Sequence, residues 1–345
     1  MNFRTIKKIP TAEEIIQEFP LSEEGMHRVA QDRQDVKNIL SGKDDRKLVI
    51  VGPCSAWPYE PVIEFGRRLV EINKEVKDKL KLIMRVYIQK PRTKKGWTGP
   101  VNQPNPFTAA DIEEGVKYTR SMMVQLIEMG LPIADEALFT HNAKGFLELL
   151  SWVAIGARSV EDQEHRVFAS SIECPVGMKN TTTGEIEPAV NGIVAAQAEH
   201  VAVFSGNQVE TLGNKNAHLV LRGGLDRPNY GIDDLRLSKK LLEKNEVENP
   251  AIVIDCSHDN CRLDGKKDYS RQAVVIKDII TELSEDEEMK NLVKGFMFES
   301  FIKGGNQKAT EHTAETIDKD GLSITDPCLG WEETASIIKE MSQKL

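Results

Sequence analysis

The sequence lacks an excess of basic residues. Its 345 residues include 45 lysines and arginines against 54 aspartates and glutamates, giving a formal net charge of −9 at pH 7. A general nucleic-acid binder, or a protein that binds anionic membranes, needs a net positive face to attract phosphates. We therefore expect neither nucleic acid nor membrane among its partners.

Long apolar segments and dense cysteines are also missing. The start, MNFRTIKKIPTAEEIIQEFP, is broken by charges, so it has the pattern of neither a signal peptide nor a membrane span, and no later window is apolar for long enough. The five cysteines are odd in number and widely spaced, and no CxxC or HxxxH occurs. This usage is typical of a reduced protein, so we expect a cytoplasmic location.

What the sequence does contain is a series of apolar runs separated by amphipathic stretches of helical period. Runs such as KLVIVGPCS (47–55) and AIVIDCSH (251–258) are nearly all apolar, as buried parallel strands are. Alternating strands and helices indicate a parallel sheet. The length would fit two average domains or one large barrel.

Nine such runs occur, one more than a barrel needs. HVAVFS (200–205) is followed by GNQ and the short VETLG (209–213), which predicts a β-hairpin inserted near 200–212. We predict an α/β fold, an eight-stranded (β/α) TIM barrel over residues 46–345, with this hairpin between barrel strands five and six. Residues 1–45 are polar and helical in pattern, and we expect them to form an N-terminal extension.

Each predicted barrel strand ends in a charged or ligand-type side chain. In chain order these are Cys54, Arg85, Glu136, Arg158, Lys179, Arg222, His258 and Glu299. An open doubly wound sheet would gather such residues at its switch point, whereas a barrel assembles its active site from all strands at the C-terminal face. Chance polarity would also include serine, threonine and asparagine, so the pattern favours a barrel.

One set of these residues is cationic: Arg85, Arg158, Lys179 and Arg222, with Lys90 and Arg92 just beyond strand two. The stretch MRVYIQKPRTKKGWTG (84–99) contains no acid at all. Arginine suits carboxylate and phosphate oxygens in bidentate geometry. Any one of these residues alone is better interpreted as a structural salt bridge. Together, cations that converge on one mouth would repel unless polyanions bound there, which indicates one or two phosphorylated substrates.

A second set consists of metal-type donors. Cys54, His258 and Glu299 stand at strand ends, and Asp326 follows the last strand in SITDPCLGW. A thiolate, an imidazole and two carboxylates form a plausible site for one divalent metal ion. The mixture of soft and hard donors does not select the metal, so Fe, Mn, Zn, Co and Cu all remain open.

At these residues the sequence resembles a known family. VGPCS, MRVYIQKPRTKKGWTG, SWVAIGARSVEDQEHRVFAS, CPVGMKN, LRGG, SHDN and SITDPCLGWEET are similar to segments of the type I 3-deoxy-D-arabino-heptulosonate 7-phosphate (DAHP) synthases. The resemblance implies a metal-dependent barrel that condenses phosphoenolpyruvate with erythrose 4-phosphate, the first step of the shikimate pathway. It also implies one divalent metal ion (Mn, Fe, Zn or Co) and a homodimer or homotetramer.

The resemblance also assigns site residues. It implies metal ligands at Cys54, His258, Glu299 and Asp326, and phosphoenolpyruvate contacts at Arg85, Lys90, Glu136, Gly156, Ala157, Arg158, Lys179 and Arg222. The segment Lys90, Pro91, Arg92 and Thr93 corresponds to the erythrose 4-phosphate segment, with Arg92 on the phosphate. The chemistry then suggests Lys90 as proton donor and Glu136 as the group that orients the attacking water.

The sequence departs from the family pattern in places, and alternatives stay open. Asp135 stands where a small residue is expected, and Phe301 stands where a histidine often occurs. A synthase for another aldose phosphate, 3-deoxy-octulosonate 8-phosphate or an amino-sugar variant, is one alternative. A non-catalytic phosphoenolpyruvate-binding homologue is another, although it would be expected to have lost a metal ligand or Lys90.

The family also implies a pocket for a feedback aromatic amino acid, built from the N-terminal extension and the hairpin. Glu173 and Ala202 replace the small and aromatic residues expected near that pocket. A carboxylate beside an apolar pocket carries a desolvation cost, and loss of an aromatic ring removes packing. We therefore expect phenylalanine to inhibit the enzyme poorly.

Overall fold

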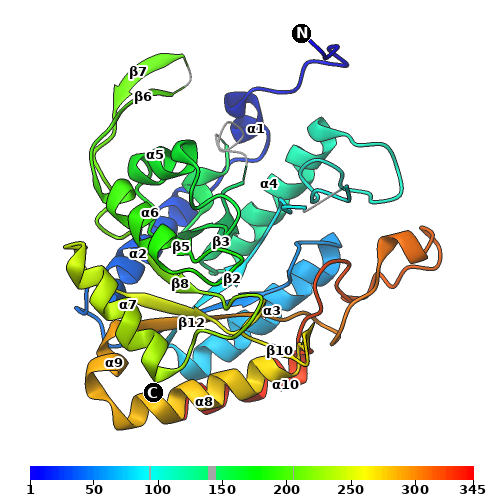
Figure 1. Cartoon of the computed structure of the whole chain (residues 1–345). Coiled ribbons are helices and arrows are strands. Elements are labelled where there is room, and N and C mark those ends of the chain that lie inside the picture. Colours follow the sequence, from blue (N-terminus) through cyan, green and yellow to red (C-terminus); the bar gives the residue numbers. More distant parts are fainter. Residues whose placement is uncertain (93–94, 139–144, 205) are drawn as a thin grey trace.

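The computed structural model describes residues 1–92, 95–138, 145–204 and 206–345 (Figure 1). Within these residues, eight parallel strands close into a barrel in the order β1-β12-β9-β8-β5-β4-β3-β2. The barrel strands are β1 (Lys47–Gly52), β2 (Leu80–Arg85), β3 (Ile133–Glu136), β4 (Trp152–Ile155), β5 (Val176–Lys179), β8 (His218–Leu221), β9 (Ile252–Asp255) and β12 (Val293–Glu299). The α/β barrel predicted from the sequence is confirmed.

Helices cover the outside of the barrel (Figure 1). They are α1 (Ala12–Glu18), α2 (Glu23–Leu40), α3 (Tyr59–Val76), α4 (Ile112–Glu128), α5 (Gln163–Ser171), α6 (Glu187–Gln197), α7 (Ile232–Lys244), α8 (Arg271–Glu285), α9 (Glu287–Leu292) and α10 (Trp331–Lys344). Each outer helix buries one apolar stripe, as α3 does with Val62, Phe65 and Leu69. None of the helices in the described part of the chain has the length and apolar character to cross a membrane.

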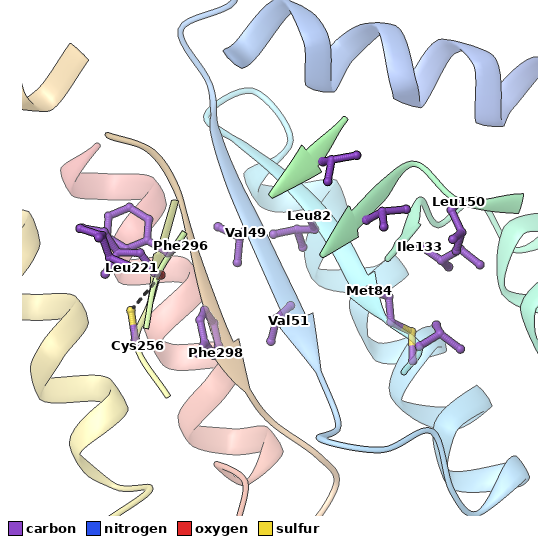
Figure 2. Close-up of a cluster of buried hydrophobic side chains, with 14 of the residues drawn as sticks. Val49, Val51, Leu82, Met84, Ile133, Leu150, Leu221, Cys256, Phe296 and Phe298 are labelled. Carbon is purple, nitrogen blue, oxygen red and sulfur yellow. Dashed lines mark hydrogen bonds between the residues drawn. The ribbon is translucent and has the colours of Figure 1, made fainter. Parts of the chain in front are cut away.

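The barrel strands are buried on both faces because alternate side chains point outwards and inwards. In β1, Val49 and Val51 belong to the core shared with the helices, whereas Leu48 and Ile50 belong to the barrel interior. Figure 2 shows part of the outer layer, with side chains of β2 and β12 on either side of β1. This double burial explains why the strand runs are almost uniformly apolar in sequence.

The N-terminal end of the barrel is closed by α2. Val36, Ile39 and Leu40 share a buried cluster with the interior residues Leu48 and Ala251, which lie near strand starts. Part of the predicted N-terminal extension therefore packs as the floor of the barrel. With this end closed, only the C-terminal end of the strands remains for a site.

Two short antiparallel ladders extend from the barrel. β6 (Val201–Phe204) pairs with β7 (Asn207–Glu210), in the chain between barrel strands β5 and β8, and β10 (Arg262–Leu263) pairs with β11 (Lys266–Lys267). The side chain of Glu173 is 86% exposed and pairs with Arg33 at 3.6 Å. Its expected effect on an aromatic effector stays a prediction.

Candidate active site

The C-terminal ends of the barrel strands surround a cavity of about 420 Å³. The sequence-predicted residues that line it are Cys54, Arg85, Lys90, Pro91, Arg92, Glu136, Ala157, Arg158, Lys179, Arg222, His258 and Asp326. Glu299 lies behind this lining, buried at the end of β12. Gly156 packs against Glu136, whose Oε1 would lie 2.2 Å from a Cβ at that position, so a larger residue there would displace the Glu136 carboxylate. Thr93 lies outside the described residues.

Three cations at the base of the cavity are each paired with a buried acid. The closest nitrogen–oxygen distances are 3.0 Å for Arg85–Glu299, 2.9 Å for Lys179–Asp255 and 2.6 Å for Arg222–Asp259. Such pairing is required because a lone buried charge is costly to desolvate. Even so, the buried Nε of Arg85 has no hydrogen-bond partner within the described residues.

Three of the four predicted metal donors converge beside these cations, and the fourth, His258, lies next to one of them. A ligand atom from each of Cys54, Glu299 and Asp326 lies within 4.8 Å of the other two. His258 Nε2 lies 3.9 Å from Glu299 Oε1, while its Nδ1 lies 2.8 Å from Asp255 Oδ2. Anchoring of one ring nitrogen by a carboxylate is typical of histidines that bind metal through the other. The donor chemistry therefore fits one divalent cation.

The protonation states of these donors also suit a cation. Burial lowers the pKa of His258 below its ordinary value, even though Asp255 opposes the shift, so the ring is neutral and can donate an electron pair. Burial, assisted by the charge of Glu299, raises the pKa of the Cys54 thiol. A cation would have to supply the charge that converts this thiol to a thiolate. His258 also has a φ of 54°, an unusual backbone conformation for a residue with a side chain, and such conformations cluster at functional sites.

Lys90 connects the metal donors with the acid-free stretch. Its Nζ donates to the Cys54 carbonyl at 2.6 Å and lies 3.2 Å from Cys54 Sγ. Burial lowers the pKa of Lys90, but the acidic groups around it, which include Glu299 and Glu136, raise it more, so its pKa stands above the ordinary value. Lys90 is therefore a protonated ammonium group within reach of both the metal donors and the cavity.

Asp135, one of the departures from the family pattern, holds the backbone segments that lead to Lys90 and Glu136. Its Oδ1 accepts hydrogen bonds from the backbone N–H groups of Glu136, at 2.8 Å, and Ile88, at 3.2 Å. The first belongs to the strand end that carries Glu136, and the second lies two residues before Lys90. Burial raises the pKa of Asp135 to about 8. This carboxyl group therefore ties the ends of β2 and β3 together below two candidate catalytic residues.

The rim of the cavity differs from its base. Arg92 and Lys95 line the cavity but are exposed, and neither has an acidic partner within the described part of the chain. Their segment is held by the backbone: Lys90 N–H donates to Thr98 O, and Gly99 has a φ of 104°. A Cβ at Gly99 would lie 2.3 Å from the Ile88 carbonyl oxygen, so only glycine allows this approach.

Comparison with known proteins shows the family of the chain. A family model described as the DAHP synthetase I family matches residues 18–339. Phospho-2-dehydro-3-deoxyheptonate aldolase, Tyr-sensitive, of Escherichia coli (strain K12) is 38% identical over 340 residues, which cover 97% of this chain and 92% of that protein. The chain belongs to the DAHP synthetase I family.

Two further relatives place the whole chain within this family. Phospho-2-dehydro-3-deoxyheptonate aldolase of Corynebacterium glutamicum is 36% identical over 344 residues, covering 97% of this chain and 91% of that protein. The solved structure of the Francisella tularensis SCHU S4 phospho-2-dehydro-3-deoxyheptonate aldolase has a TM-score of 0.92 and 34% identity, with 99% of this chain and 98% of that chain covered. The resemblance inferred from the sequence motifs is confirmed.

Several residues of the candidate site were missed by sequence reasoning. Those that line the cavity are Tyr87, Thr182, Lys267 and Thr325, and those that pair with its cations are Asp255 and Asp259. Asp255 and Asp259 lie on either side of His258 in the sequence. They could have been predicted, because buried cations require acidic partners. Lys267 gave no local signal, because its position depends on how the β10–β11 ladder folds back over the site.

Proposed function

We propose that this chain condenses phosphoenolpyruvate with D-erythrose 4-phosphate and water to give DAHP and phosphate, the first step of the shikimate pathway. Family membership over nearly the whole chain supports this activity. The observation that carries it is one cavity at the barrel mouth in which cations and metal-type donors meet. Two phosphorylated anions need charge neutralisation and fixed placement before a bond can form between them.

The reaction forms one carbon–carbon bond and breaks one carbon–oxygen bond. C3 of phosphoenolpyruvate bonds to the aldehyde carbon of erythrose 4-phosphate, and the aldehyde oxygen takes a proton. Water adds at C2, and phosphate leaves with cleavage of the C2–O bond. The residues assigned to hold phosphoenolpyruvate are Arg85, Gly156, Ala157, Arg158, Lys179 and Arg222, with arginine forks matching carboxylate and phosphate oxygens.

Lys90 and Glu136 act on protons and water in this scheme. Lys90 holds a proton on Nζ, next to Cys54, and donates it to the aldehyde oxygen as negative charge develops there. Glu136 ends β3 inside the cavity and orients the water that attacks C2. Asp135 connects the segments that carry these two residues, because it accepts a backbone hydrogen bond from each segment.

Cys54, His258, Glu299 and Asp326 would hold one divalent metal ion. Bound there, the ion would supply Lewis acidity toward a carbonyl oxygen. The combination of thiolate, imidazole and carboxylate suits divalent Mn, Fe, Zn or Co and does not select one of them.

Pro91, Arg92 and Thr93 form the segment assigned to erythrose 4-phosphate. Arg92 is supported in this role by its position at the cavity rim and by the absence of an acidic partner within the described residues. A guanidinium group that is not committed to the protein can pair fully with an incoming phosphate.

We also infer a cytoplasmic homodimer or homotetramer. All five cysteines are free, as expected in a reducing compartment. Apolar side chains are exposed on the N-terminal segment, at Phe3 and Ile6, and on the β6–β7 ladder, at Val201 and Val203. Such residues are typical of surfaces that are covered by another subunit.

The activity is tested with phosphoenolpyruvate and a panel of aldose phosphates, with and without a chelator. We expect phosphate release and DAHP formation with erythrose 4-phosphate, loss of both after chelation, and recovery with Mn²⁺ or Fe²⁺. A preference for arabinose 5-phosphate would instead indicate 3-deoxy-octulosonate 8-phosphate synthesis. Turnover that survives exhaustive chelation would contradict the metal site.

A further inference from the structure

Lys267 reaches the metal donors from a part of the fold outside the barrel strands. It lies in β11, and its ladder partner is Arg262 in β10, the strand that follows the loop carrying His258. The base of this ladder is held by a hydrogen bond from Asp268 N–H to the Cys261 carbonyl. From there Lys267 Nζ donates to Asp326 Oδ2 at 2.6 Å, across 59 residues of sequence.

The ladder itself is anchored to the base of the cavity. Arg262 forms an ion pair with Asp259, and the same carboxylate pairs with Arg222. Asp259 is buried, so this double pairing fixes the ladder relative to the barrel. Lys267 is therefore presented to Asp326 by a supported element rather than by a free surface chain.

With this contact, each of the four proposed metal donors has a partner among the neighbouring side chains. The other donors each have a partner of their own: Glu299 with Arg85, His258 with Asp255, and Cys54 with Lys90. Asp326 is the donor with the greatest need of one. It lies on the connection after β12 rather than on a strand, and its side chain is 42% exposed, against 2% for Glu299.

We propose that Lys267 is a positioning residue of the metal centre, which fixes Asp326 beside Cys54 and Glu299 and thereby sets the affinity for the divalent cation. Residues that orient metal ligands commonly affect metal affinity or activity by about 10- to 100-fold when they are replaced.

The inference rests on the metal site proposed above, and one titration separates the two. Chelator-stripped protein is titrated with Mn²⁺ by calorimetry as wild type, Lys267→Met and Lys266→Met. Lys266 is the neighbouring residue of β11 and is exposed, so its replacement removes the same charge without touching Asp326. We expect Lys267→Met to raise the Kd for Mn²⁺ by about 10-fold or more and Lys266→Met to change it by less than about threefold.

A wild type that binds no Mn²⁺ would overturn the metal site and this inference together. Wild-type binding with an unchanged or lower Kd in Lys267→Met would overturn only the role of Lys267; a lower Kd would mean that its ammonium competes with the metal. In an Asp326→Asn background the effect of Lys267→Met should shrink to the level of the Lys266 control. If Lys267→Met does not fold, Lys267→Gln is judged by the same outcomes, and Lys267→Arg should keep most of the affinity.

Discussion

The base and the rim of the barrel mouth both carry cations, but they hold them differently. At the base, Arg85, Lys179 and Arg222 are buried and each is paired with an acid. At the rim, Arg92 and Lys95 are exposed and have no acidic partner within the residues that the structure describes. The base is arranged before any ligand arrives, whereas the rim gains its partner only from a ligand.

This difference matches the division of the two substrates. A prearranged base can hold phosphoenolpyruvate and the metal donors in one geometry, because its side chains lose little freedom on binding. Arg92 and Lys95 at the rim suit the phosphate of erythrose 4-phosphate, the longer substrate. The same division predicts that replacements at the base affect both stability and chemistry, while replacements at the rim affect only substrate binding.

The largest effect should come from Lys90, where base and rim meet. Lys90→Met removes the proposed proton donor, and general acid catalysis contributes about 10²- to 10⁴-fold to rates. We expect kcat for phosphate release at saturating substrates to fall by that amount. Lys95→Met, which removes a rim charge from the same segment, is the control and should retain most of kcat. A loss of less than about tenfold in Lys90→Met would contradict its role as donor.

The second-largest difference between the base and the rim is expected in the free energy of unfolding. Arg85→Met leaves Glu299 buried without its closest charged partner, and breaking a buried pair in this way costs about 3–5 kcal/mol. Arg92→Met should change the free energy of unfolding by no more than about 0.5 kcal/mol, as surface replacements do. Urea unfolding of metal-free protein measures both. Equal destabilisation by the two variants would remove the distinction between base and rim.

The pH dependence of the free energy of unfolding tests the raised pKa of Asp135. The pKa of Asp135 is raised by burial from 3.8 to about 8, so its contribution to folding is complete below pH 3.8 and is lost as the pH rises through 8. Asp135→Asn keeps an oxygen for the two backbone N–H groups and cannot ionise. Its stability relative to wild type should therefore rise by about 1 kcal/mol or more between about pH 5 and pH 9. A difference that does not vary with pH would show that Asp135 is not shifted.

The smallest effect is expected at Lys95. An exposed charge that faces a phosphate contributes about 0.2–1 kcal/mol, so Lys95→Met should raise the KM for erythrose 4-phosphate by about 1.4- to fivefold. The effect should diminish as salt is added, since salt screens exposed charges. An equal rise in the KM for phosphoenolpyruvate would place Lys95 with the base instead.

The sequence predicted the barrel and most of the site because these features are local in the chain. Each strand is an apolar run that ends in a functional side chain, so Arg85, Lys179 and His258 could be assigned to one face without any tertiary information. The acidic partners were missed because pairing is a tertiary property: Asp259 pairs with a cation from a different strand. Lys267 was missed for the same reason. The expected effect of Glu173 on an aromatic effector stays a prediction, because it depends on contacts with a bound ligand.

The most direct test of the division between base and rim is the affinity for phosphoenolpyruvate alone, measured by calorimetry on wild type, Arg222→Ala and Arg92→Ala. Loss of one charged phosphate contact costs about 1.5–3 kcal/mol, so Arg222→Ala should weaken phosphoenolpyruvate binding by about 10-fold or more. Arg92→Ala should leave this Kd unchanged and raise only the KM for erythrose 4-phosphate. Equal weakening of phosphoenolpyruvate binding by both variants would contradict the account.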